Sequence, residues 1–119
     1  LKDKDISVVF GAGGNRDKGK RPRMGMVAGK IAKKIYVTSD NPRDEVPEMI
    51  LEDILVGLHG KGHVTATPDR RLAIKMALED LDEGDVLMIL GKGDEDYQEI
   101  KGVKHHFDDR EVVRELLAQ

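Results

Sequence analysis

The chain lacks cysteine and tryptophan, and aromatic residues make up only 3% of its 119 positions. Without cysteine it can form neither a disulfide nor a thiolate metal site, which suits the cytoplasm. The scarcity of aromatic side chains argues against a stacking platform for single-stranded nucleic acid. No apolar run reaches membrane-spanning length, and the start of the chain has no secretory pattern.

The balance of charge also argues against a nucleic-acid partner, because the net charge is −3 and the pI is near 5.8. Hydrophobic residues at 39% and charged residues at 36% are typical of a soluble globular protein, and 119 residues can enclose a core of their own. We therefore expect one domain over residues 1–119. The chain begins at Leu1 and meets a strand signal almost at once, so we expect a piece of a longer protein, with processing of the chain as the alternative.

Strand and helix signals alternate along the chain, as they do in α/β domains. The predicted strands are Ile6–Phe10, Ile35–Thr38, His63–Ala66 and Val86–Leu90, and the predicted helices are Pro22–Lys33, Pro47–Leu58, Pro68–Leu81 and a last one from Asp108 or Asp109 to Leu117. This alternation predicts a mostly parallel sheet with right-handed crossovers.

Three finer expectations follow from the same pattern. Val86–Leu90 is expected to be the most buried strand. Tyr97–Ile100 and Val103–Phe107 are expected to form a hairpin that adds an antiparallel edge to the sheet. The first helix is expected to place its apolar residues on one side, namely Met24, Val27, Ala28 and Ile31.

Ligands of parallel α/β sheets bind beyond the carboxyl ends of the strands. Four connections follow predicted strands and should lie along that edge: Gly11–Arg16, Ser39–Arg43, Thr67–Asp69 and Gly91–Glu95. Most of them are dense in charge and glycine. Their convergence is a stronger indication of a binding site than any single motif.

The first connection, GAGGNRDKGKRP, is a glycine-rich and cationic turn between a strand and a helix, which is a typical anion-binding arrangement. Gly14-x-x-x-x-Gly19-Lys20 nearly matches a P-loop, but Arg21 stands where the magnesium-binding Ser or Thr belongs. The sequence therefore argues against a P-loop that hydrolyses nucleotide by itself.

A dinucleotide site is a second interpretation of the same turn. Gly11-x-Gly13 begins the fingerprint of such sites, although Arg16 replaces its third glycine. Asp40 would then be the acid that binds the ribose. This alternative stays open at the level of the motif.

The turn Asp40-Asn41-Pro42-Arg43 also has two interpretations. Asx-Pro sequences commonly form turns without any further role. The same residues present a carboxylate, an amide and a guanidinium together, which fits a zwitterionic amino-acid head group with Arg43 on its carboxylate.

The run GKGDEDYQ, residues 91–98, follows the fourth predicted strand. Its plainest interpretation is a solvated loop. Its acids nevertheless lie opposite a cationic edge, so that Glu95 would accept an ammonium while Arg16 and Arg43 hold a carboxylate.

The four histidines do not indicate a metal site. His59 and His63 flank glycines at the end of a predicted helix, and the adjacent His105 and His106 would point to opposite faces of a strand.

Four runs of the sequence together resemble one family. GAGGNRDKGKRP, TSDNPR, GKGDEDYQ and FDDRE follow the order and approximate spacing of the carboxy-terminal domain of the Mur ligases, over nearly the whole chain. Within the family the resemblance is closest to the ligases that add meso-diaminopimelate to UDP-MurNAc-L-Ala-D-Glu in cytoplasmic peptidoglycan synthesis. It implies a Rossmann-like three-layer α/β domain from an enzyme that requires ATP and Mg²⁺.

The resemblance also implies which parts of the enzyme are missing here. An N-terminal domain that binds the UDP-linked precursor and a central domain that binds ATP are expected to lie outside this chain. The chain contains no GxxxxGK[ST] motif. By itself it is therefore expected to be inactive.

Roles for individual residues follow from the resemblance. The diaminopimelate-binding positions are Arg16, Asp40, Asn41, Pro42, Arg43, Gly91 and Glu95. The two arginines match contacts to the side-chain carboxylate, and Gly91 and Glu95 match contacts to the distal ammonium. Positions that approach ATP in the closed enzyme are matched by Asp17, Lys18 and Lys20. Ligases that use L-lysine usually vary the DNPR turn, because lysine lacks the second carboxylate and would leave buried cations unpaired.

One position departs from the family, since Asp94 stands where GKGHEDYQ has a histidine and adds negative charge beside Glu95. Two other functions stay open. The chain could be a non-catalytic module that binds an amino acid or a nucleotide. It could also belong to a related ligase with another acceptor, such as folylpolyglutamate synthase, although the DNPR turn and the 91–98 loop favour the cell-wall enzyme.

Overall fold

The computed structural model describes residues 5–92 and 95–119, so Asp94 lies outside the described residues. Four parallel strands form one sheet in the order β3-β2-β1-β4. The strands are β1 (Ile6–Phe10), β2 (Lys34–Val37), β3 (Val64–Ala66) and β4 (Val86–Ile89), and the helices are α1 (Lys20–Ile31), α2 (Pro47–Val56), α3 (Arg70–Glu79) and α4 (Asp109–Leu117). In the register of the sheet, Val8 of β1 lies between Ile35 of β2 and Met88 of β4.

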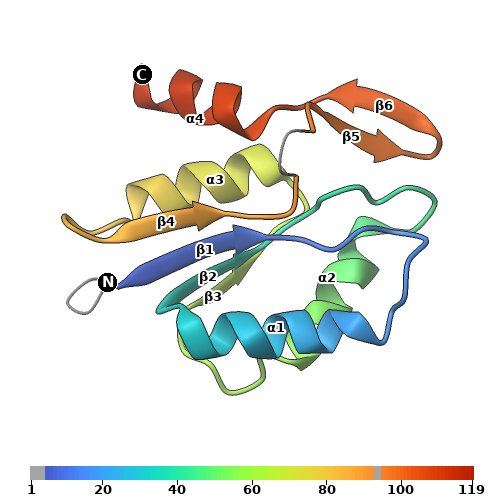
Figure 1. Cartoon of the computed structure of the whole chain (residues 1–119), viewed down its shortest axis with the longest axis horizontal. Coiled ribbons are helices and arrows are strands. Elements are labelled where there is room, and N and C mark those ends of the chain that lie inside the picture. Colours follow the sequence, from blue (N-terminus) through green and yellow to red (C-terminus); the bar gives the residue numbers. More distant parts are fainter. Residues whose placement is uncertain (1–4, 93–94) are drawn as a thin grey trace.

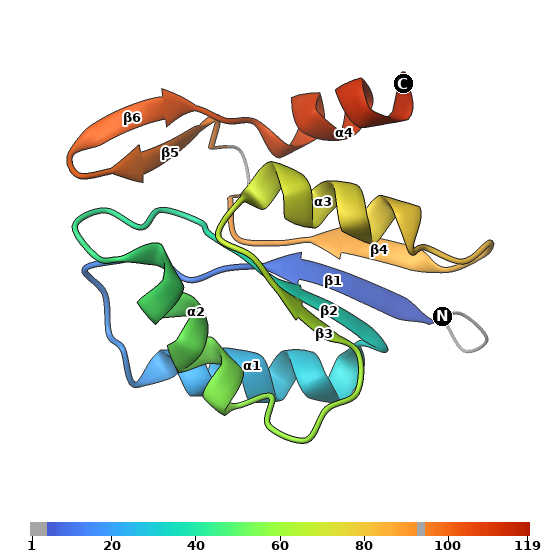
Figure 2. The same cartoon turned by 180° about the vertical axis from the view of Figure 1, so that it is seen from behind.

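Helices cover both faces of this sheet, with α1 and α2 on one face and α3 and α4 on the other (Figures 1 and 2). Side chains of a strand point alternately to the two faces. Val8 and Phe10 accordingly belong to the core under α1 and α2, whereas Val9 belongs to the core under α3 and α4. The structure confirms the expected three-layer α/β fold with a mostly parallel sheet.

Glycines let α1 and α2 pack unusually close together. A Cβ on Gly25 of α1 would lie 2.3 Å from the carbonyl oxygen of Ile54, and a Cβ on Gly57 would lie 1.9 Å from that of Pro22. Both distances are far below van der Waals contact. The close packing fixes α1, and with it the end of the glycine-rich connection that precedes it.

Two expectations about the sheet were wrong. The strand at residues 86–89 is only half-buried, because the chain crosses back over β1 and leaves β4 at an edge. The hairpin of β5 (Tyr97–Ile100) and β6 (Val103–His106) does form, but as a separate two-stranded sheet. A bridge between Arg43 and Ile100 pairs the hairpin with the connection after β2 rather than with β4.

The predicted apolar side of α1 is also only partly buried. Ala28 is buried, whereas Val27 and Ile31 are 59% and 50% exposed. These side chains line a groove of about 480 Å³ between α1 and the β1–β4 pair, whose floor includes Phe10 and Leu90. The groove is open because α1 covers β1 and does not reach across the edge strand.

Candidate functional site

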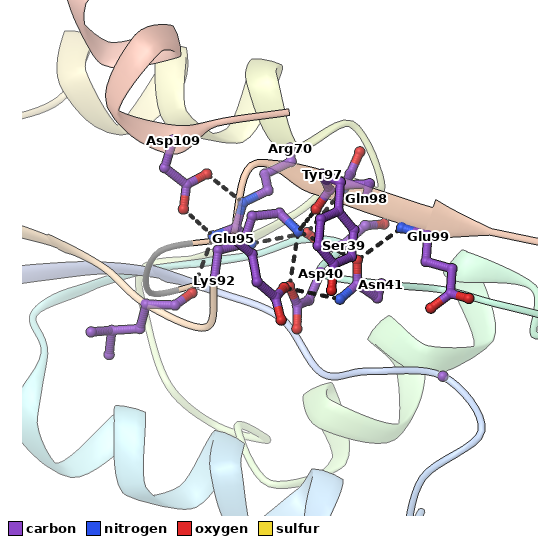
Figure 3. Close-up of polar contacts among 12 residues, drawn as sticks. Ser39, Asp40, Asn41, Arg70, Lys92, Glu95, Tyr97, Gln98, Glu99 and Asp109 are labelled. Carbon is purple, nitrogen blue, oxygen red and sulfur yellow. Dashed lines mark hydrogen bonds and ion pairs between the residues drawn. The ribbon is translucent and has the colours of Figure 1, made fainter. Parts of the chain in front are cut away.

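The candidate site lies where three neighbouring strands end. In the sheet, β1 has β2 on one side and β4 on the other, so the connections after these strands meet although they are far apart in sequence. Figure 3 shows the polar side chains that the connections after β2 and β4 place together. In the connection after the edge strand β3, residues 67–69, Asp69 accepts a hydrogen bond from the backbone N–H of Leu72 and caps α3. The predicted convergence therefore holds for three connections.

The first pair in the site joins Asp40 to Lys92. The ammonium of Lys92 lies 3.1 Å from Oδ1 of Asp40, and the lysine side chain is fully buried. Gly91 packs beside the same carboxylate, since a Cβ on Gly91 would lie 3.8 Å from Cγ of Asp40. This ion pair connects the DNPR turn to the loop after β4.

Asn41 is the central hydrogen-bonding residue of the site and is 2% exposed. Its Oδ1 accepts the backbone N–H of Glu99 at 2.8 Å, and its Nδ2 donates to Oε1 of Glu95 at 3.2 Å (Figure 3). Glu95 is half-buried. Its carboxylate therefore lies at the DNPR turn, as the sequence predicts.

Arg43 is the last residue of the same turn. Its Nε donates to Glu99 at 3.3 Å and an Nη atom donates to the carbonyl oxygen of Gly14 at 3.0 Å. Its φ of 53° places it in the left-handed region, which turns the side chain back toward the glycine-rich connection. The backbone also pairs with the hairpin, because Arg43 N–H donates to Glu99 C=O at 2.8 Å.

Arg16 lies next to Arg43 at the glycine-rich connection. A Cβ on Gly13 would lie 2.7 Å from Nη1 of Arg43 and 3.5 Å from Cγ of Arg16, so both arginines flank Gly13. Arg16 is exposed. The neighbouring Gly14 allows this arrangement, because a side chain there would collide with the carbonyl oxygen of Pro42, only 1.8 Å from the ideal Cβ position.

A buried arginine, Arg21, holds the glycine-rich connection in place. Arg21 donates to both carboxylate oxygens of Glu45, at 3.0 and 2.8 Å, and to the carbonyl oxygen of Gly13 at 3.1 Å. The backbone N–H of Asn15 donates to Glu45 at 2.6 Å. These hydrogen bonds, above all those from Arg21, lower the pKa of Glu45 to about 2.

A second buried arginine, Arg70, ties the bases of two connections together. It forms a bidentate pair with Asp109 at 2.8 and 2.7 Å. It also donates to the carbonyl oxygens of Ser39 and Leu90, at 3.0 and 3.1 Å (Figure 3). These carbonyls directly precede Asp40 and Gly91, so Arg70 holds the starting points of both loops.

The remaining predicted residues lie around this centre. Pro42 is buried within the turn. Asp17 accepts the backbone N–H of Gly19 at 2.9 Å and shapes the entry to α1. Lys18 is exposed and lies 3.8 Å from Glu45, and Lys20 is an exposed residue at the first position of α1.

Sequence reasoning missed the partners that hold these side chains in place. Lys92 and Glu99 pair with residues of the DNPR turn, and Arg70 and Asp109 support it from behind. The available signal was weak, consisting only of isolated charges within apolar or glycine-rich stretches. Such a charge indicates a buried partner but does not identify it.

The arrangement places groups of opposite charge near one edge of the sheet. Arg16 and Arg43 provide guanidinium groups that suit a carboxylate, and Glu95 provides a carboxylate that suits an ammonium. Within residues 5–92 and 95–119, no group of three or more metal-ligating side chains is arranged around a common point. The helices described by the structure are too short or too polar to cross a membrane.

Comparison with known proteins identifies the family of this chain. Residues 1–93 match the family model described as Mur ligase, glutamate ligase domain. The chain belongs to the Mur ligase family. The resemblance seen in the sequence is therefore confirmed, and the chain corresponds to the carboxy-terminal domain of these ligases.

Similar Mur ligases cover most of this chain. Proteins named UDP-N-acetylmuramoyl-L-alanyl-D-glutamate--2,6-diaminopimelate ligase from Helicobacter hepaticus and Aquifex aeolicus are each 60% identical to it, over 95% and 98% of its length. A solved structure of a ligase with the same name has a TM-score of 0.90 at 47% identity and covers 96% of this chain. In all three comparisons the chain spans 24% of the other protein.

Proposed function

We propose that this chain is the domain that binds meso-diaminopimelate in an ATP-dependent ligase. The ligase would join this amino acid to UDP-MurNAc-L-Ala-D-Glu in cytoplasmic peptidoglycan synthesis. The observation that carries the proposal is that one turn, at the edge where three strands end, contacts Glu95 through Asn41 and reaches the glycine-rich connection through Arg43. The names of the relatives support the same substrate.

The proposed ligand matches the charges of the site. Meso-diaminopimelate carries a carboxylate and an ammonium at each end. In this proposal Arg16 and Arg43 contact the distal carboxylate, Gly91 and Glu95 contact the distal ammonium, and the buried Asn41 and Pro42 shape the turn between them. The amine at the other end then stays free to react.

ATP and Mg²⁺ would be held mainly by domains outside this chain, since the chain has no GxxxxGK[ST] motif. When bound, ATP supplies the activation of the D-glutamyl carboxylate. The residues of this chain would orient the free amine toward that carboxylate and help to exclude water. In the proposal, the exposed Lys18 and Lys20 approach the ATP phosphates, and Asp17 holds the turn that carries them.

Binding measurements on the chain test the proposal. In an NMR titration, meso-diaminopimelate should bind at a saturable site, and L-lysine should bind about tenfold more weakly. Lysine leaves the guanidinium of Arg43 without its ligand, although Glu99 at 3.3 Å limits the penalty. Arg43→Ala should weaken diaminopimelate binding by a similar factor.

The control is Arg114→Ala, which removes an exposed arginine of α4 and should leave the affinity unchanged. Equal affinity for lysine and diaminopimelate, or an unchanged affinity in Arg43→Ala, would contradict the proposal.

A further inference from the structure

The side chain of Lys92 is fully buried beneath the candidate site (Figure 3). Its ammonium donates to Asp40 Oδ1 at 3.1 Å, to the carbonyl oxygen of Tyr97 at 2.7 Å and to Asn41 Oδ1 at 3.5 Å. An ammonium has three N–H donors, so acceptors of the protein itself occupy all of them. Lys92 is therefore saturated and cannot serve as a direct contact for a ligand carboxylate.

Lys92 helps to determine which way the amide of Asn41 faces. Oδ1 of Asn41 meets two donors, the ammonium of Lys92 and the backbone N–H of Glu99. In the flipped orientation, the NH₂ group of Asn41 would face those two donors and leave them without an acceptor. The observed orientation directs Nδ2 to Oε1 of Glu95, 3.2 Å away.

Lys92 also neutralises the other carboxylate of the site. The carboxylate of Asp40 is 14% exposed and is paired with Lys92. Without that cation, Asp40 would be a second unpaired carboxylate close to Glu95, and it would compete for any ammonium that enters. With Lys92 in place, the charge of Asp40 is used within the protein and Glu95 is left to the ligand.

We infer that Lys92 is a positioning residue for ammonium recognition. It holds Asn41 so that this amide orients Glu95, and it removes Asp40 as a competing acceptor. The inference rests on the proposed function, because it specifies how the same site distinguishes a ligand with a distal ammonium from one without it.

The test compares two ligands that differ only in that ammonium. L-2-aminopimelate keeps both carboxylates of diaminopimelate and lacks the distal ammonium. NMR titrations give the ratio of the two dissociation constants for the unchanged chain, for a double variant with Lys92→Met and Asp40→Asn, and for Lys75→Met. Lys75 is an exposed lysine of α3, so its substitution controls for the loss of a positive charge.

The unchanged chain and Lys75→Met should bind diaminopimelate at least about tenfold more tightly than L-2-aminopimelate. In the double variant, which also removes the Asp40 carboxylate that would otherwise accept the ammonium, this preference should fall close to one, while the affinity for L-2-aminopimelate changes little. A purely structural role of Lys92 would weaken both ligands equally and preserve the ratio, and that result would overturn the inference.

Asp40→Asn alone covers the case in which the double variant does not fold. This single variant should keep the preference for diaminopimelate, because Lys92 still holds Asn41 and Glu95 in place. If Asp40→Asn alone abolishes the preference, Asp40 is the ammonium acceptor and the inference is wrong.

The proposed function fails separately from this inference. If the unchanged chain does not bind diaminopimelate, or binds it independently of Arg43, the assigned site is wrong. If Arg43→Ala weakens binding while the double variant of Lys92 and Asp40 keeps the ligand preference, only the role of Lys92 is wrong.

Discussion

Glu45 joins the glycine-rich connection to the buried Arg21, and its pKa of about 2 lies well below the ordinary value of 4.5. A carboxylate with a lowered pKa stabilises the folded state above its unfolded-state pKa, and this stabilisation is lost as the pH falls toward the folded-state value. Glu45→Gln should therefore lower the free energy of unfolding at pH 7 by about 1–3 kcal/mol. It should also reduce the loss of stability between pH 4.5 and pH 2. Urea denaturation across this pH range measures both effects.

Glu52→Gln is the matched control, because Glu52 is an exposed residue of α2. Its stability at pH 7 should change by less than about 0.5 kcal/mol. If both variants lose as much unfolding free energy at acidic pH as the unchanged chain does, the ion pair of Glu45 does not contribute to stability in acid.

At the scale of elements, α4 is attached to α3 by two arginine–carboxylate pairs of very different burial. The Arg70–Asp109 pair joins side chains that are 0% and 15% exposed, whereas the Arg71–Glu115 pair joins side chains that are 41% and 59% exposed. Asp109→Ala leaves a buried guanidinium without its carboxylate and should cost about 3–5 kcal/mol. Glu115→Ala breaks an exposed pair and should cost less than about 1 kcal/mol.

Denaturant unfolding measures the two costs, and hydrogen exchange of the α4 amides shows whether the helix detaches. Because Arg70 also holds the carbonyls of Ser39 and Leu90, Asp109→Ala should increase exchange at the loops that follow them. If Asp109→Ala and Glu115→Ala lower the free energy of unfolding equally, burial does not determine how much these ion pairs contribute to stability.

At the scale of the whole molecule, the chain spans 24% of the relatives compared above and has no motif for phosphate binding of the GxxxxGK[ST] type. By itself it should release no phosphate from ATP and should form no amide bond. When it replaces the matching quarter of the Aquifex aeolicus ligase, the chimera should add diaminopimelate to the UDP-linked precursor. Phosphate release and product formation measure this.

The same chimera with Arg43→Ala is the control, and it should require a higher diaminopimelate concentration for half-maximal rate. Phosphate release by the isolated chain would contradict the prediction. An inactive chimera that still binds all its substrates would show that this chain does not complete the ligase.

The sequence predicted most of the fold because its signals are local. Hydrophobic runs located the strands, and Pro47 was placed at the first residue of α2. The last helix was expected from Asp108 or Asp109 and has Asp108 as its N-cap, whereas α3 begins at Arg70, two residues after the expected Pro68. Local signals could not place β4 at the edge, because an edge strand and a central strand have similar apolar sequences. The hairpin was predicted as a pairing, but its position depends on the bridge between Arg43 and Ile100.

For the site, the sequence by itself determined which connections carry charge and which family the chain belongs to, since short motifs are enough to identify both. Only the tertiary structure decided the partners. Lys92 and Asp40 are 52 positions apart, and Arg43 and Glu99 are 56 apart. No periodicity or spacing links residues at such separations. They come together because the chain, after β3, returns past β1 and adds β4 on its other side. The sequence therefore sets which side chains are charged, and the order of the strands in the sheet decides which of them form pairs.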